Sequence, residues 1–183
     1  GSVTPPVGFV NYLGVTSSSS YSSLSTDYFN LCQPIEGYNM ADLNWGSANA
    51  KTVTLSFWVR SSLTGTFGGS LMNSAGNRSY PFSYTISTAT TWEKKTITIP
   101  GDTTGTWPID NNGSMFVIFD LGNGSNYRST AGSWQTSVGG YYGVTGSVNL
   151  VGTTNATFDV TGVQLEIGSS ATLFERRPRK NIE

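Results

Sequence analysis

The chain has 183 residues, of which 11% are charged, and its formal net charge at pH 7 is −1. This balance excludes a surface that attracts nucleic acid or an acidic membrane, and the absence of histidine excludes a Ser-His-Asp triad and imidazole metal ligands. The single cysteine, Cys32, cannot form an internal disulfide, and we expect a small buried side chain there. No apolar run reaches the roughly 20 residues of a membrane helix, so we expect no membrane insertion.

The first quarter of the chain predicts two short strands and one helical turn. Residues 7–15 predict a strand, whereas the serine-rich residues 16–25 predict a loop because they are too polar to pack. Residues 28–35 predict a second strand, and Pro34 restricts it to a sheet edge or a strand end. Residues 39–46 predict a single helical turn.

The middle of the chain alternates between strands and glycine-rich turns. The clearest strand covers residues 51–60, where apolar residues from Val53 to Val59 share one face and polar residues occupy most of the other. Residues 115–119 are apolar on both faces, which predicts either a subunit contact or a covering loop. Further strands are predicted at residues 66–72, 79–87, 92–99, 114–121, 144–150 and 156–167.

The last predicted strand changes its inward register partway along. Apolar residues occupy even positions up to Val160 and odd positions from Val163 onward. A shift by one residue sends every later side chain to the opposite face unless an extra residue absorbs it. We therefore expect a β-bulge at Gly162.

Many short strands with no convincing helix predict an all-β fold, an antiparallel two-sheet β-sandwich. A jelly-roll type is favoured over an immunoglobulin pattern because the length suits about eight strands and the sequence has no Cys-Trp-Cys arrangement. The length suits one domain. Residues 1–34 would add strands and the serine-rich loop to a core formed by residues 35–177, followed by a basic tail at 178–183.

No spacing of residues predicts catalysis. Acidic side chains occur on several predicted strands, but none forms a pair that stands out, so we assign no catalytic residue and expect a protein that is not an enzyme. A structural calcium ion is the one cofactor considered, because calcium needs only oxygen ligands. Glu36 and Glu166, before and at the end of the core strands, are its candidate ligands.

The sequence contains more residues suited to ligand binding than to catalysis, because aromatic residues gather in predicted loops beside amides and an arginine. Exposed aromatic rings stack on the apolar faces of sugar rings, while amide and guanidinium groups bind hydroxyls. The alternative is that these rings are large packing residues, as we expect for Trp58 and Trp92, or contacts within a trimer. The candidate ligand-binding residues are Trp107, Asn126, Tyr127, Arg128, Trp134, Gln135, Tyr141 and Tyr142.

Residues 160–177, VTGVQLEIGSSATLFERR, resemble the closing motif of phage tail-fibre and related virion receptor-binding domains. Further blocks of the same resemblance are PIEGYNMADL at 34–43, VTLSFWV at 53–59, TGTF at 64–67, TWE at 91–93, PGDTTGTW at 100–107 and IFDLG at 118–122. The resemblance implies the C-terminal tip of a tail fibre, with a β-sandwich similar to carbohydrate-binding modules and a homotrimer in the virion. It supplies no ligand residues.

Together, these observations predict a receptor-binding domain that recognises host cell-surface carbohydrate, such as polysaccharide or lipopolysaccharide, without catalysis. Its expected location is the virion, after assembly in the bacterial host cytoplasm. Two alternatives are a structural domain that trimerises or caps the fibre and binds no sugar, and, less favoured, a polysaccharide-degrading enzyme. Within the closing motif, Phe174 is expected to anchor the exit segment, and Gln164 and Glu166 to form structural hydrogen bonds or bind a cation.

Overall fold

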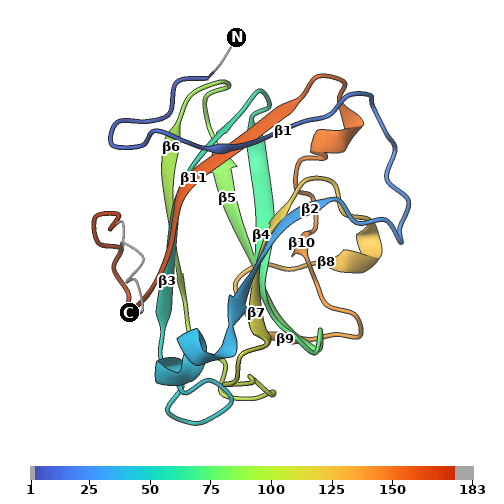
Figure 1. Ribbon diagram of the computed structural model, residues 1–183. Coiled ribbons are helices and arrows are strands. Elements are labelled where there is room, and N and C mark those ends of the chain that lie inside the picture. Colours follow the sequence, from blue (N-terminus) through green and yellow to red (C-terminus); the bar gives the residue numbers. More distant parts are fainter. Residues whose placement is uncertain (1–2, 176–183) are drawn as a thin grey trace.

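The computed structural model describes residues 3–175, which form two antiparallel β-sheets packed face to face (Figure 1). Sheet A has the order β1-β11-β3-β6, formed by β1 (Leu13–Thr16), β11 (Thr157–Ile167), β3 (Val53–Ser61) and β6 (Glu93–Ile99). Sheet B has the order β2-β7-β4-β5-β9, formed by β2 (Asn30–Glu36), β7 (Gly113–Asp120), β4 (Gly65–Asn73), β5 (Arg78–Ile86) and β9 (Gln135–Thr136). The all-β, two-sheet antiparallel sandwich is therefore confirmed.

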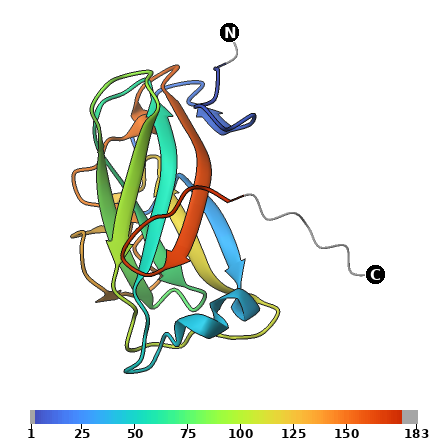
Figure 2. The same ribbon diagram turned by 90° about the vertical axis from the view of Figure 1, so that its left-hand side faces the viewer.

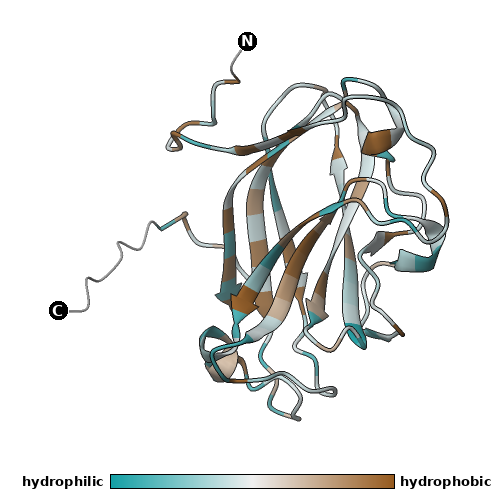
Figure 3. Ribbon diagram, turned by 45° about the vertical axis from the view of Figure 1, so that its right-hand side comes forward, coloured by the Kyte–Doolittle hydropathy of each residue, from teal (hydrophilic) through white to brown (hydrophobic). Residues whose placement is uncertain are grey.

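The core lies between the sheets and follows from the two-residue period of the strands. In β3, the apolar residues from Val53 to Val59 are fully buried, as their alternation predicts. The ring of Phe57 lies 5.0 Å from that of Phe119 in sheet B. Apolar and polar residues alternate along the strands in Figure 3. No helix within residues 3–175 is long and apolar enough to cross a membrane.

A layer of loops and short elements covers the outer face of sheet B (Figure 1, right). It contains η2 (Ser125–Tyr127), β8 (Arg128–Ser129), β10 (Gly143–Val144) and η3 (Leu150–Gly152). Gly68 of β4 lies so close to it that a Cβ atom there would come within 3.1 Å of Val144. Ile118, on the outer side of β7, is 2% exposed. The chain's own loops thus bury the second face of β7 at Ile118, as the covering-loop alternative expects, whereas Phe116 on the same face is half-buried.

Three expected elements differ from those observed. The expected strand at 7–15 is reduced to β1, because the N–H of Phe9 donates to the carbonyl of Pro6 and Gly8 has φ +91°, which make a turn. The expected strand at 144–150 is reduced to the end of β10 (Gly143–Val144), because the chain turns at Gly146 and enters η3 at Leu150 without forming a further strand. The expected helical turn is η1 (Gly37–Leu43), a 3-10 helix that Asn44 ends in the left-handed conformation. The remaining predicted strands agree to within a few residues.

β11 contains the predicted bulge. Its pairing with β3 shifts register between Thr161 and Gln164, and Gly162 has φ +59°. A Cβ atom on Gly162 would lie 2.5 Å from the Cζ of Phe9, so the ring of Phe9 packs directly over the bulge.

The exit segment after β11 folds back beside the outer face of sheet A (Figure 2). The ring of Phe174 lies 5.1 Å from that of Phe9, and Phe174 remains 41% exposed. The side chain of Gln164 accepts a hydrogen bond from the N–H of Glu175 at 3.0 Å. The exit is therefore held by one aromatic contact and by the polar side chains of β11. The expected basic tail at 178–183 lies outside the described residues.

Gly162→Ala is expected to destabilise the protein by about 1 kcal/mol through the left-handed backbone and by about 1–3 kcal/mol more through displacement of Phe9. Urea unfolding would measure the loss. Gly146→Ala is the matched control, because Gly146 has φ +82° but a Cβ atom added there would have no atom within 4 Å. Equal losses in the two variants would show that Phe9 does not pack on the bulge.

Candidate functional site

The candidate ligand residues separate into two groups in space. Trp107 and Trp134 lie at one end of the sandwich, whereas Asn126, Tyr127 and Tyr142 lie in the layer over sheet B. Trp107 is buried and Asn126 is exposed, whereas Trp134, Tyr127 and Tyr142 are all half-buried.

The tryptophan group is a packed cluster. The rings of Trp45, Trp107 and Trp134 lie 4.8 to 5.5 Å from one another, and Tyr80 lies 5.4 Å from Trp134. Trp107 is only 7% exposed, and the Nε1 of Trp134 donates to the carbonyl of Pro100 at 2.7 Å. Trp107 therefore has no open face to stack on a sugar, which corrects the expectation for this residue. Trp134 is half-buried and holds the loop at Pro100.

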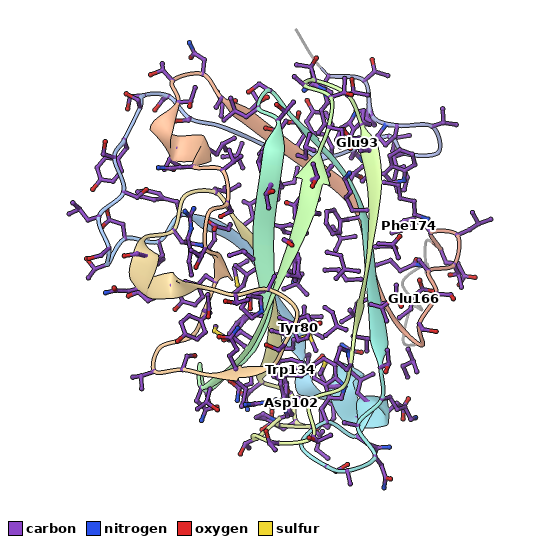
Figure 4. The ribbon with its side chains drawn as sticks, turned by 180° about the vertical axis from the view of Figure 1, so that it is seen from behind. Tyr80, Glu93, Asp102, Trp134, Glu166 and Phe174 are labelled. Atoms are coloured by element: carbon purple, nitrogen blue, oxygen red, sulfur yellow. The ribbon has the colours of Figure 1, made fainter. Side chains whose placement is uncertain are left out.

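A buried ion pair between Arg78 and Asp102 lies at the same end of the molecule as the tryptophan cluster. The carboxylate of Asp102 accepts hydrogen bonds from the Nε and Nη2 of Arg78 at 2.8 and 2.6 Å and from the Nε1 of Trp107 at 3.3 Å. The guanidinium of Arg78 also lies 5.9 Å from the ring of Trp134. Figure 4 shows Tyr80, Trp134 and Asp102 together at this end. These contacts indicate a structural cluster.

The side chains of Arg128 and Gln135 likewise form an ion pair and hydrogen bonds that stabilise the fold. The guanidinium of Arg128 pairs with the buried carboxylate of Asp120, with Nε–Oδ2 and Nη2–Oδ1 distances of 2.9 and 3.3 Å. The side-chain amide of Gln135 accepts from the hydroxyl of Ser129 and donates to the carbonyl of Thr130. Neither head group is free to bind hydroxyls as expected, and both instead fix the loops that carry the other candidates.

The second group forms a tyrosine cluster of Tyr28, Tyr127 and Tyr142. The rings of Tyr127 and Tyr142 are stacked, with centroids 4.9 Å apart and planes 14° apart. Tyr28 meets both edge-on at 5.8 and 6.0 Å and is 63% exposed. The N–H of Tyr142 donates to the carbonyl of Tyr127, so the backbone fixes the stacked pair. Burial raises the pKa of the Tyr142 hydroxyl, and Tyr127, Tyr28 and Cys32 add to the effect.

Tyr28 was not among the predicted ligand residues. Its position in a predicted strand gave no indication that the fold brings it beside residues about 100 positions later. Tyr141 was predicted as a ligand residue, but its ring forms no aromatic pair with any other ring of residues 3–175. Its backbone N–H donates to the hydroxyl of Ser79.

Cys32 is exposed on the edge strand β2, so its expected burial is wrong. Partial burial nevertheless raises the pKa of its thiol.

A polar hollow of about 280 Å³ adjoins the tyrosine cluster across η2. Asn126 is exposed on η2, between Ser125 of the hollow and Tyr127 of the cluster in sequence, and its backbone N–H donates to the carbonyl of Ser25. The lining of the hollow consists of hydroxyls, amides and the Arg128 side chain, and it contains no carboxylate. The residues that line it include Ser23, Ser25, Asn123, Ser125, Arg128, Thr145 and Asn149.

The two candidate calcium ligands do not form a recognisable metal site. Both carboxylate oxygens of Glu166 accept hydrogen bonds from Thr172, one from its N–H and one from its hydroxyl. These bonds lower the pKa of Glu166. Glu36 is exposed at the end of β2, and no group of three or more Asp, Glu or Cys residues within the described chain could hold a metal ion. Calcium binding stays a prediction, and the hydrogen bonds of Glu166 fit its structural alternative.

No protein-family model matches the chain, and no curated protein matches it either. A solved structure described as "CBM4 structure and function" is similar to it, with 15% sequence identity and a TM-score of 0.43. The match covers 86% of this chain and 71% of that chain. At this identity and TM-score, the similarity says nothing about a ligand.

The lowered pKa of Glu166 predicts a pH dependence of stability. An ionised Glu166 stabilises the folded chain above its ordinary pKa of about 4.3, and this contribution is lost as the pH falls through the lower folded-state value. Glu166→Gln is therefore expected to be less stable than wild type at pH 7, by under about 1 kcal/mol because the group is only partly buried. The difference should vanish as the pH falls from about 5. Urea unfolding across this range would measure it, and a constant difference would contradict the assignment.

Proposed function

We propose that this protein is a non-catalytic carbohydrate-binding domain whose site is the tyrosine cluster with Asn126 and the polar hollow beside it. The single observation that carries the proposal is the set of three tyrosine rings brought together by distant segments, with Tyr28 63% exposed and Tyr127 and Tyr142 half-buried. Sugar rings present apolar C–H faces edged by hydroxyls. A surface that combines aromatic rings with amides and hydroxyls complements both features.

The charges on the protein favour a ligand that is neutral or weakly charged. The arginine nearest the site, Arg128, is already paired with the buried carboxylate of Asp120. The net charge of the whole chain is −1. Attraction between opposite charges therefore contributes little, and recognition would depend on ring stacking and uncharged hydrogen bonds.

We further propose that the glycan belongs to a host cell surface and that the domain is the receptor-binding tip of a phage tail fibre, located in the virion. The support for this proposal is the resemblance of residues 34–177 to such domains. It is consistent with assembly in a bacterial cytoplasm, because the single cysteine requires no oxidising compartment.

A structural role in trimerisation is the second candidate, and an apolar cleft favours it. A cleft of about 390 Å³ opens between β2 of sheet B and β1 and β11 of sheet A. Leu31, Leu165 and Val163 line it, and Val163 is 41% exposed. A second copy of the chain could cover this cleft in a homotrimer. If so, the sedimentation mass of the protein should be three times that of one chain, and Val163→Lys should reduce it; a monomeric wild type would contradict this candidate.

The carbohydrate proposal predicts that Tyr142→Ala weakens binding to immobilised lipopolysaccharide and capsular polysaccharide of candidate hosts by about tenfold or more, as for the loss of a central aromatic contact. Tyr142→Phe, which keeps the ring, should bind nearly as wild type does.

Tyr38→Ala is the matched control, because Tyr38 is 64% exposed on η1 and is not part of the cluster. Wild-type protein that is retained on no polysaccharide would refute the proposal. Equal binding by the Tyr142→Ala and Tyr38→Ala variants would show that the binding site does not include the tyrosine cluster. Release of reducing ends from any of these polysaccharides would favour the degrading-enzyme alternative.

A further inference from the structure

Trp58 differs from the other four tryptophans in the state of its indole N–H. The Nε1 groups of the other four donate to carbonyl or carboxylate oxygens. The Nε1 of Trp58 has no acceptor among residues 3–175, and it is not enclosed, because the enclosed and unpaired side-chain atoms of this range belong to Tyr84, Ser114, Asn123 and Ser137. The half-buried Trp58 therefore presents a free donor to solvent, whereas a packed tryptophan usually pairs its N–H.

The ring of Trp58 also lacks the contacts of a packing residue. It forms no aromatic pair with any ring of residues 3–175. Trp92, the other tryptophan that was expected to pack, lies 5.8 Å from the ring of Tyr12 and donates to the carbonyl of Thr4. Trp92 thus has the role that was expected of both residues, and Trp58 does not.

A groove of about 350 Å³ lies over Trp58 on the outer face of sheet A. The N-terminal segment contributes Val7 and Phe9 to its lining, and the exit segment contributes Leu173 and Phe174. Both segments lie on the side of sheet A in Figure 1. Val7 is fully exposed and Leu173 is 86% exposed, so the groove has an apolar rim. Its volume is near the small end of ligand pockets and suits one sugar ring.

Lys94 supplies one positive charge to this groove. It is the cross-strand partner of Trp58 in the pairing of β3 with β6, so the two side chains share the outer face. Lys94 is exposed and forms no ion pair within residues 3–175. Hydrogen bonding by Thr172 is the largest cause of the lowered pKa of Glu166, and the charge of Lys94 is the smallest. No carboxylate lines the groove itself, so Lys94 is available to an anionic ligand.

These groups determine which ligand fits. The indole ring stacks on a ring that has an apolar C–H face, as sugar rings have. A carboxylate accepts hydrogen bonds from both the indole N–H and the ammonium, and such charge-assisted bonds are stronger than bonds to a hydroxyl. One lysine balances one carboxylate charge, whereas phosphate sites use several N–H groups or cations. A hexuronic acid combines the apolar ring face with a single carboxylate.

We propose that this groove is a second binding site, which takes a hexuronic acid unit of a polysaccharide. The sugar ring lies on Trp58, and its carboxylate accepts from the Nε1 of Trp58 and the Nζ of Lys94. The site lies on the outer face of sheet A, whereas the tyrosine cluster belongs to the layer over sheet B. The inference goes beyond the proposed function, because it uses no residue of the tyrosine cluster and concerns an acidic sugar.

The test titrates the full chain with methyl glucuronide and methyl galacturonide, with the neutral methyl glucoside and methyl galactoside, and with benzoate. NMR follows the indole N–H resonance of Trp58 and the backbone N–H resonance of Gly162, which also lines the groove. At least one uronide should shift both resonances. Its neutral parent should bind roughly tenfold more weakly or less, because it lacks the charged acceptor. Benzoate distinguishes a sugar site from a site for any cyclic carboxylate.

Two variants test the two donors separately. Lys94→Gln removes the charge, and Trp58→Phe keeps an aromatic ring but removes the N–H. Each should weaken uronide binding roughly tenfold, as for the loss of a hydrogen bond to a charged group, and should change the binding of the neutral parent little. Lys51→Gln is the matched control, because Lys51 is also exposed but does not line the groove. Thermal unfolding checks that each variant folds.

The outcomes separate this inference from the carbohydrate function of the tyrosine cluster. Unchanged uronide affinity in Tyr142→Ala supports a separate site, and an equal loss in Tyr142→Ala and Lys94→Gln overturns it. The inference is also overturned if no uronide shifts the two resonances, if only benzoate does, or if Lys94→Gln binds the uronide as Lys51→Gln does. A sedimentation mass above one chain that Leu173→Lys reduces to one chain would assign the groove to a subunit contact instead.

Discussion

The buried carboxylate of Asp120 is the interaction on which the layer over sheet B depends. Its oxygens accept from five donors: the N–H groups of Gly122 and Asn123, the Nε and Nη2 of Arg128, and the hydroxyl of Ser147. A buried ion pair is weak support for stability by itself, but removing one partner costs about 3–5 kcal/mol because a charge is left unpaired. Since these donors come from three parts of the loop layer, one side chain at the end of β7 fixes the layer against the sheet.

Asp102 likewise fixes a loop against a sheet at the end of the molecule that contains the tryptophan cluster. It is buried, pairs with Arg78 and accepts from Trp107, so it ties one loop to sheet B. Asp120 and Asp102 lie in two blocks of the sequence resemblance, IFDLG and PGDTTGTW, and Gln164 and Glu166 of the closing motif hold the exit segment. The parts of the sequence that are easiest to recognise therefore encode the scaffold. They indicate how the loops are held and not what the loops bind.

The strands could be predicted because burial on one face imposes a two-residue period, and Gly162 because a bulge is the simplest way to absorb a register shift. The loops impose no such period. Trp107 and Tyr127 occur in equally aromatic loops, yet Trp107 is buried and donates to Asp102, whereas Tyr127 is only half-buried and stacks on Tyr142. The pairing of Tyr28 with Tyr142 depends on β2 lying beside β7 under the loop layer, which is a property of the topology and not of local composition.

The same carboxylate also links the two halves of the candidate site. Asp120 fixes Asn123, a residue of the hollow, and Arg128, which directly follows Tyr127. The hollow and the stacked rings are thereby held at a fixed separation on either side of η2. Fixed groups lose little entropy when a ligand binds, and this matters most for a sugar, whose individual contacts are weak. A rigid shared anchor would also allow side chains such as Ser125 and Thr145, which project from the layer without supporting it, to change the sugar preference while the fold stays constant.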